Sequence, residues 1–372
     1  MHSKKGVIEL QFNWIFILVA GALILIFFVV IVQRQEKVSE NKRDVDIRGK
    51  LSTILTSAKQ STGTMFVIKI PDTEIKFDCS GYSVGGTAPF QLDESFSPSR
   101  LKSSQQNLLI WAMDWSLPYK VANLQYITSP DIKYVVIAES QAVNDLKKIL
   151  PQNITVAMVQ HDQVQNLEST NNYMIRFIII TREGLPTYTP VTLTLHPSIS
   201  RMKDDDVSAI QIMIDEPGTD NELDGHGRVA LFRKGGSSFS ATPSPVNKPY
   251  IKKELLLGAI FSDREETYDC VSKRAFEQYA LTSEIYQRRT GALFDLYQDN
   301  VDPMNRGPYA GFCDSFVIYS QASDLIDGLN VFLDNILGNK QDIYNTAYGS
   351  GIGENLRKMN KDLLRRSCPL IY

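Results

Sequence analysis

The segment Gly81-Tyr82-Ser83-Val84-Gly85 matches the G-x-S-x-G pattern, in which a serine hydroxyl group can act as a nucleophile. That chemistry requires a strand before the serine and a helix after it, so that the hydroxyl group is exposed on a sharp turn. Strand-like residues precede Ser83, but Gly86-Thr87-Ala88-Pro89 follows and is a poor helix start. We therefore interpret the segment as a glycine-rich turn beside Cys79, with Ser83 as a weak candidate catalytic residue.

An acidic segment resembles part of a calcium-binding loop. Asp220, Glu222 and Asp224 occupy positions 1, 3 and 5 of such a loop, and a glycine occupies position 6. Position 12, which requires a bidentate glutamate, is Leu231. Because strand-like residues flank the segment, the acidic tip of a hairpin is the simpler interpretation, and the three carboxylates are weak candidate metal ligands. No phosphate-binding glycine loop or dinucleotide motif is present, and we expect no cofactor.

Two further clusters could be functional or structural. Asp204-Asp205-Asp206 is typical of a solvated charge run. Core packing is the simpler interpretation of an aromatic-rich stretch, and a recognition surface is the alternative; its members are Trp111, Trp115, Tyr119 and Tyr126.

The chain has four cysteines: Cys79, Cys270, Cys313 and Cys368. If three helices expected near the C-terminus alternate in direction, Cys313 at the start of the second lies near Cys368 at the end of the third. Cys270 then lies a helix length away, which leaves Cys79 as its partner. Of the three possible pairings we favour Cys313–Cys368 with Cys79–Cys270. The alternative is four free thiols in a cytoplasmic domain; the wide cysteine spacing does not indicate a zinc site.

The strongest pattern in the sequence is an apolar segment near the N-terminus. Trp14–Val32 contains 19 residues without a charge, and Phe12 extends the apolar stretch. At 1.5 Å per residue, one helix of this length spans close to the ~30 Å hydrocarbon core of a bilayer. A cleaved signal peptide has a shorter apolar region followed by small residues. We therefore expect a retained anchor, with residues 12–32 in contact with lipid.

Two sets of observations disagree on the orientation of this anchor. Lys4 and Lys5 precede it, whereas six basic residues follow within residues 34–50, and this count places the C-terminal side in the cytoplasm. The even number of cysteines, the large folded domain and a glycosylation sequon at Asn153-Ile154-Thr155 favour the opposite side. We expect an extracytoplasmic body.

The residues Lys4-Lys5-Gly6, then Glu9 and an apolar helix, resemble the class III (prepilin-type) signal of archaeal pilin-like proteins. The resemblance covers about 30 residues and implies cleavage after Gly6 and a helix that packs inside a filament. Glu9 departs from the pattern because it is third, not fifth, after the implied cut. The segment 11–16 also resembles the start of uncharacterised single-pass archaeal proteins. A plain signal anchor remains the alternative.

The segment after the anchor predicts a helical stalk. Ile47, Leu51, Ile54, Leu55 and Ala58 lie on one face of a helix, and Ser61-Thr62-Gly63 ends it. The rest of its surface carries charges of both signs. Such a helix can pack on the body or pair with a second copy, and we expect the former because the stripe spans under three heptads.

The next 200 residues predict a mixed α/β sheet with helices on its faces. Residues 65–70 and 74–79 indicate a hairpin or two short strands, and residues 105–115 are apolar at helical spacing. Residues 134–138, 140–150 and 154–159 indicate a strand, a helix and a second strand, which implies a parallel pair. Four more apolar runs, grouped with the strands, cover residues 174–181, 209–214, 229–232 and 255–261.

Residues 271–299, 312–337 and 342–366 predict three helices. The sequence thus predicts a transmembrane anchor over residues 1–33, a helical stalk over 34–62, an α/β domain over 63–265 and a C-terminal helical subdomain with the cysteines over 266–372.

Composition limits the function classes. The net charge is −3, and 43% of the residues are hydrophobic, which excludes wholesale disorder and argues against a nucleic-acid partner. We expect a single-pass membrane-anchored protein that acts by binding or assembly with protein partners at the cell surface. A pilin-like subunit and an anchored serine hydrolase using Ser83 are the alternatives.

Overall fold

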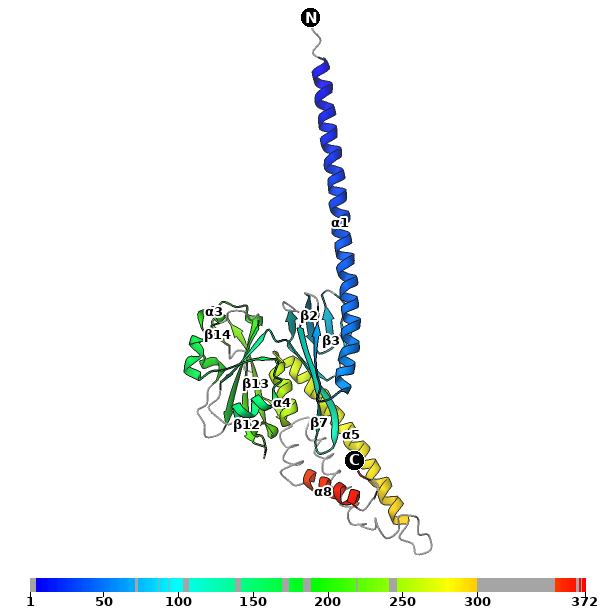
Figure 1. Cartoon of the computed structure of the whole chain (residues 1–372), viewed down its shortest axis with the longest axis vertical. Coiled ribbons are helices and arrows are strands. Elements are labelled where there is room, and N and C mark those ends of the chain that lie inside the picture. The colour runs from blue at the N-terminus through cyan, green and yellow to red at the C-terminus, as the bar shows by residue number, and fades with distance from the viewer. Residues whose placement is uncertain are drawn as a thin grey trace.

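The structure is a computed structural model of the chain, in which one long helix precedes a body of strands and shorter helices (Figure 1). It describes residues 5–70, 73–85, 87–92, 94–102, 107–137, 142–168, 174–182, 189–218, 220–240, 246–299, 352–365, 368 and 370–372.

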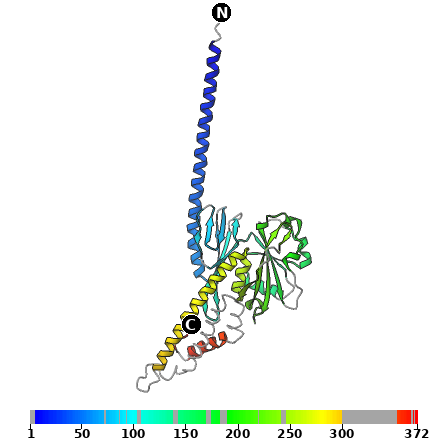
Figure 2. The same cartoon turned by 180° about the vertical axis from the view of Figure 1, so that it is seen from behind.

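Helix α1 (Lys5–Gln60) runs without interruption for 56 residues. Its N-terminal half projects away from the body, and its C-terminal end lies along one side of it (Figures 1 and 2). The helix ends as expected at Ser61–Gly63, where Gly63 adopts a φ of +78° and its N–H donates to the carbonyl oxygen of Ala112 at 2.9 Å. A positive φ of this size costs glycine little, so Gly63 stops the helix and redirects the chain.

The predicted apolar stripe of the stalk packs on the body. Ile47, Leu51, Leu55 and Ala58 are buried, and Ile54 packs against the same core. The Gln125 side chain donates from Nε2 to the carbonyl oxygen of Leu55 at 2.7 Å. The stalk is therefore one layer of the body's core, which confirms packing on the body.

The first sheet is a four-stranded layer in the order β1-β7-β8-β5. β1 and β7 pair antiparallel, as do β7 and β8, whereas β5 pairs parallel with β8. The strands are β1 (Met65–Lys69), β5 (Ser95–Phe96), β7 (Asn107–Ser116) and β8 (Lys120–Thr128).

The second sheet has the order β10-β9-β11-β12-β13-β14, and β15 also pairs with β13. β10, β9, β11 and β12 are parallel, and α2 (Ala142–Ile149) connects β9 to β10, which confirms the predicted strand, helix and strand. The other strands are antiparallel. The members are β9 (Ile132–Ile137), β10 (Thr155–Met158), β11 (Met174–Arg182), β12 (Val207–Glu216), β13 (His226–Gly235), β14 (Ser238–Phe239) and β15 (Lys248–Ile251).

The third sheet is small, with the order β4-β3-β2-β6. Its strands are β2 (Glu74–Asp78), β3 (Gly81–Val84), β4 (Phe90–Gln91) and β6 (Arg100–Lys102). β1 and β2 therefore belong to different sheets, and of the two interpretations of residues 65–79 the one with two separate strands is confirmed. The expected single mixed sheet is three sheets.

Two element types were predicted wrongly. Residues 107–116 form strand β7 and not a helix, and residues 255–261 belong to helix α4 (Lys252–Phe261) and not to a strand. Residues 108–112 of β7 and 255–261 of α4 are continuous apolar runs because they are buried on all sides, so neither run shows the period of its own structure.

The core is built around α4, which lies between the first and second sheets. On β8, Gln125 faces α1 whereas the hydroxyl group of Tyr126 donates to the carbonyl oxygen of Glu254 in α4 at 2.8 Å. Phe261 of α4 contacts the rings of Trp111 on β7 and Tyr134 on β9. The layers therefore run in the order α1, first sheet, α4, second sheet.

A second apolar cluster covers the other face of the second sheet, around Phe177 and Phe239. Short helices close that face: η1 (His161–Asn166), η2 (Pro190–Thr192) and α3 (Pro197–Ser200). The predicted aromatic stretch is core: Trp111, Trp115, Tyr119 and Tyr126 are all buried.

Two C-terminal helices are described, α5 (Glu265–Asp299) and α8 (Ile352–Arg365). They agree with the first and third predicted helices, and the second, over residues 312–337, lies outside the described residues. Tyr119 packs against Tyr279 and Tyr286 of α5 and against Tyr372, so this subdomain continues the core of the first sheet.

We expect Leu55→Ala to lower the free energy of unfolding by about 2–5 kcal/mol, because Leu55 is 1% exposed and a cavity would remain. Thr56→Ala, on the exposed side of the same helical turn, should change it by less than about 0.5 kcal/mol. Urea unfolding of the full chain in detergent, followed by tryptophan fluorescence, measures both. Equal effects of the two substitutions would show that the stalk does not pack on the body.

Candidate functional site

The apolar half of α1 lies outside the core. Apart from the half-buried Ile31, its large hydrophobic side chains that the structure describes between Trp14 and Val32 are exposed, with Trp14 72% exposed. In the part of the chain that the structure describes, α1 is the one helix long and apolar enough to cross a membrane, with a mean hydropathy of 3.0 in its most apolar window. Exposure of so much apolar surface to water is unfavourable, whereas the same surface is stable in lipid.

The stretch between the apolar half and the body is helical and solvated. The apolar run ends at Val32, and Asp44, twelve residues further on, is the first buried residue after it. This interval corresponds to about 18 Å of helix. It contains no glycine or proline, so a helix of this sequence has no built-in hinge.

Ser83 lies inside β3, where it is paired with Lys76 of β2. It is thus part of a strand and does not stand on a strand-to-helix turn. The two flanking glycines have structural roles: a Cβ at Gly81 would lie 1.8 Å from the carbonyl oxygen of Phe90, and one at Gly85 would lie 2.0 Å from Oδ2 of Asp44. Gly85 therefore lets the small third sheet approach α1.

The acidic segment forms the connection between the antiparallel strands β12 and β13, as the hairpin interpretation expects. It includes the turn η4 (Glu222–Asp224). Asp224 pairs with Lys253, with 3.9 Å between Oδ2 and Nζ, and Asp220 is exposed. Within the described ranges, no group of three or more His, Cys, Asp or Glu residues could hold a metal ion.

Asp204 and Asp205 of η3 (Asp204–Asp206) are exposed, as expected of a solvated charge run, and Asp206 is half-buried; all three are also ion-paired, which the sequence did not indicate. Lys234, whose side chain is 1% exposed, donates to Asp204 Oδ1 at 2.7 Å and to the carbonyl oxygen of Met202 at 2.8 Å. The other two aspartates pair with Arg264 and Arg100, respectively. The hydrogen bond from Lys234 holds the pKa of Asp204 below its usual range.

Two sets of buried hydrogen bonds connect the layers. No sequence motif indicated them. Asp263 accepts from the N–H and the hydroxyl group of Ser99, both at 2.7 Å, which ties the start of β6 to the end of α4. Arg176 on β11 donates to Ser208 and to the carbonyl oxygen of Ala259, both at 2.9 Å. Burial lowers the pKa of Arg176 to about 10, so it stays charged at neutral pH at the C-terminal end of α4.

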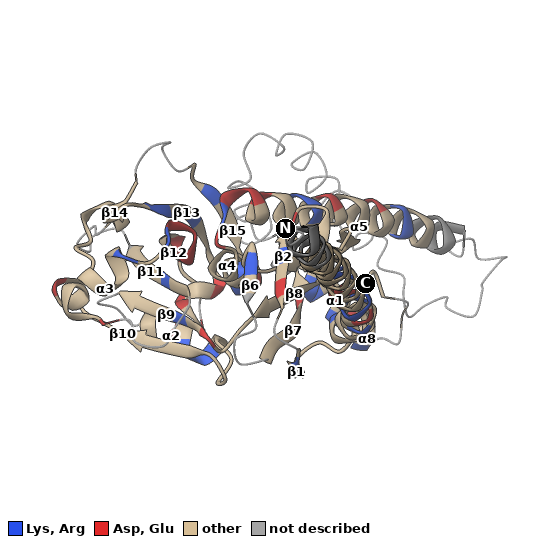
Figure 3. Ribbon diagram, turned by 90° about the horizontal axis from the view of Figure 1, so that it is seen from above, with Lys and Arg blue, Asp and Glu red and all other residues tan. Residues whose placement is uncertain are grey.

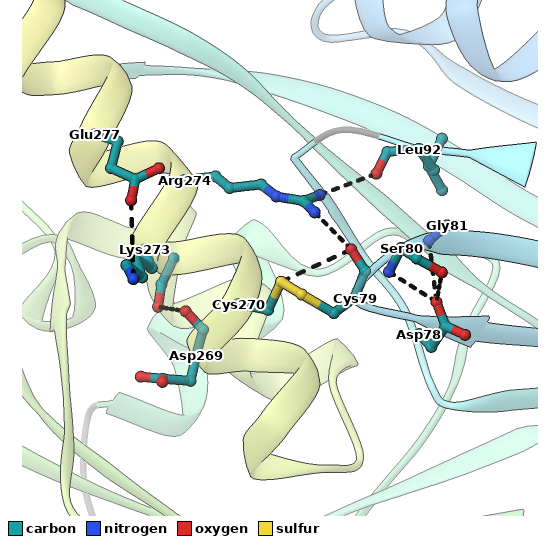
Figure 4. The surroundings of a disulfide bond; sticks show 11 residues. Asp78, Cys79, Ser80, Gly81, Leu92, Asp269, Cys270, Lys273, Arg274 and Glu277 are labelled. Carbon is teal, nitrogen blue, oxygen red and sulfur yellow. Dashed lines mark hydrogen bonds and ion pairs between the residues drawn. A yellow bond between two sulfur atoms is a disulfide. The ribbon is translucent and has the colours of Figure 1, made fainter.

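The disulfide Cys79–Cys270 is formed as predicted, with 5.8 Å between the Cα atoms. It joins the β2–β3 turn to α5, 191 residues away in the chain. Figure 4 shows Arg274 of α5 directed to the same turn, where it donates to the carbonyl oxygen of Cys79 at 2.6 Å; it also donates to that of Leu92, after β4, at 3.4 Å. Cys368 is also disulfide-bonded. Its predicted partner Cys313 lies outside the described residues, so that pairing stays a prediction.

Comparison with known proteins found no match: no family model, no curated protein and no solved structure is similar to this chain. The fold therefore defines the class only coarsely, as a mixed α/β, sheet-rich body on a long apolar N-terminal helix compatible with a single-pass anchor. The prepilin-type resemblance of residues 4–9 stays a prediction.

We expect the double substitution Cys79→Ser/Cys270→Ser to lower the free energy of unfolding by about 2–5 kcal/mol, because the bridge closes a long loop. Denaturant titration of the oxidised wild type and the variant measures this difference. Peptide mapping without reductant gives the control, since the wild type must yield a linked pair of peptides containing Cys79 and Cys270. A mapped bridge whose removal leaves stability unchanged would contradict the expectation.

Asp204→Asn should destabilise the protein at neutral pH by about 1–3 kcal/mol, because it removes the charged partner of the buried Lys234 ammonium group. Asp205→Asn, whose pair with Arg264 is exposed, should cost less than about 1 kcal/mol.

The difference between wild type and Asp204→Asn should also depend on pH. The pKa of Asp204 is lower in the folded state than its ordinary value of 3.8, so its contribution is complete above pH 3.8 and is lost as the pH falls through the folded-state pKa. Unfolding titrations between pH 3 and pH 7 test this; a difference that is constant over that range would contradict it.

Proposed function

We propose that this protein is a single-pass membrane protein that holds its sheet-rich body outside the cytoplasm, where the body acts by binding or assembly. One observation carries the proposal. The apolar half of α1 and the stalk whose stripe is buried in the core belong to one uninterrupted helix, Lys5–Gln60. Insertion of one half into a bilayer would therefore fix the height and the orientation of the body.

The body has features that suit such a role. Its layers are connected by the Cys79–Cys270 disulfide and by the buried hydrogen bonds of Asp263 and Arg176. A disulfide is stable in an oxidising compartment, which supports an extracytoplasmic body. Seen along α1 from its N-terminal end, basic and acidic residues are interspersed along the ribbon of the body (Figure 3), a pattern that suits protein partners better than nucleic acid.

The sequon gives a direct test of orientation, because Asn153 is exposed in the turn before β10. We expect the full chain, synthesised with microsomes that carry an oligosaccharyltransferase, to resist alkaline extraction and to gain one glycan at Asn153. Asn153→Gln is the matched control and should abolish the mass increase.

Two outcomes contradict different parts of the proposal. Release of the chain by alkaline extraction would show that α1 is not a membrane anchor. An extraction-resistant chain that stays unglycosylated and is fully digested by external protease would place the body on the cytoplasmic side.

A further inference from the structure

A second apolar stripe runs along α1 on the side that the body leaves free. Every seventh residue from position 17 is β-branched, through both the apolar half and the solvated stretch. Val38 is 53% exposed and Val45 is 50% exposed, although both lie beyond the uncharged run. We call this set the β-branched stripe; its members are Ile17, Ile24, Ile31, Val38 and Val45.

The stripe faces away from the body on α1. At 100° per residue, Val38 lies about 180° around the helix from the buried Ile47, and Val45 lies about 160° from Ile47 and about 100° from the buried Asp44. A partner helix on the stripe therefore would not compete with the body for α1. Figure 1 shows α1 along one edge of the body, with its other side free at the level of the stalk.

The spacing and shape of the stripe suit a second helix. A strict seven-residue repeat drifts by about 20° per heptad around a straight helix, and a left-handed supercoil keeps such a repeat facing a partner. Two-stranded parallel coiled coils carry β-branched residues at the first heptad position and leucine at the fourth; this chain has the first feature, and its fourth positions are Ala20, Phe27, Arg34 and Asn41. A groove on the same face is lined by Ile31, Arg34, Gln35, Val38, Ser39 and Lys42. Ile31, Arg34, Gln35 and Val38 are spaced i, i+3, i+4 and i+7, the four positions of a hole that receives one side chain of a facing helix.

We propose that two copies of this chain associate in parallel through the β-branched stripe of α1. The proposal rests on the membrane insertion proposed above, because copies inserted in one bilayer share their direction and their height. In a second copy at the same height, the side chains of the stripe face the holes of the first copy, and the reverse also holds. The stripe is therefore self-complementary. The bodies then lie on the outside of the helix pair.

The polar residues along the stripe set its strength. Asn41 occupies a position facing the partner and can form a hydrogen bond with its counterpart, which fixes the register. Arg34 lies two residues past the uncharged run, where its long side chain can reach the headgroups. At the edge of the helix pair, Lys37 of one copy faces Lys42 of the other, and the two positive charges repel each other. Salt screens this repulsion and should therefore strengthen the association.

Disulfide crosslinking of the full chain in lipid vesicles tests the proposal. Val38→Cys and Val45→Cys place equivalent residues of two copies within the Cα separation that a disulfide spans. Gln33→Cys is the matched control, because it lies at a similar height on the opposite face. With mild oxidation we expect a species of twice the chain mass for both stripe variants, at a yield several-fold above that of Gln33→Cys and higher still at raised salt.

Alkaline extraction of the same vesicles separates this proposal from the proposed function. If the chain is membrane-inserted and all three variants crosslink equally, the contacts are random collisions and the proposal is wrong. It is also wrong if the inserted stripe variants do not crosslink, or if in native membranes they crosslink only to a chain of different mass. A chain that is not inserted overturns the proposed function, and this proposal with it.

Discussion

One helix meets two different environments, and the rest of the molecule depends on that constraint. The first half of α1 exposes a continuous apolar surface, and its second half contributes Leu51 and Leu55 to the core. About 18 Å of solvated helix without glycine or proline connects them. Because the body packs on the helix itself and not on a flexible linker, the position of the apolar segment determines where the body stands.

The body can act as a single unit because its layers share buried contacts. Helix α4 packs on the first sheet through Phe261 and accepts from Arg176 of the second sheet. The Cys79–Cys270 disulfide adds the small third sheet to α5. The hydrogen-bonded contacts pair buried polar groups whose loss would be costly, so they hold the layers together.

Local patterns predicted the elements that have one buried face or one chemical requirement. These are the apolar segment, the stalk stripe, the β9–α2–β10 unit and the Cys79–Cys270 pair. Patterns failed where burial removes the period, as in β7 and α4, and they gave no sign of pairs between distant residues, such as Asp204 and Lys234. Around Ser83, the two glycines of the G-x-S-x-G pattern have structural reasons of their own, because Gly81 lies close to Phe90 and Gly85 lies close to Asp44.

A nitroxide scan of residues 24–45 in lipid vesicles tests the central claim most directly. Accessibility to oxygen and to a water-soluble nickel chelate would be measured at each position with the native disulfides intact. The account predicts lipid-like accessibility through Val32, aqueous accessibility beyond it, and a helical period of 3.6 residues without a break up to the body. Aqueous accessibility across residues 24–32, or loss of the helical period between residues 33 and 43, would contradict it.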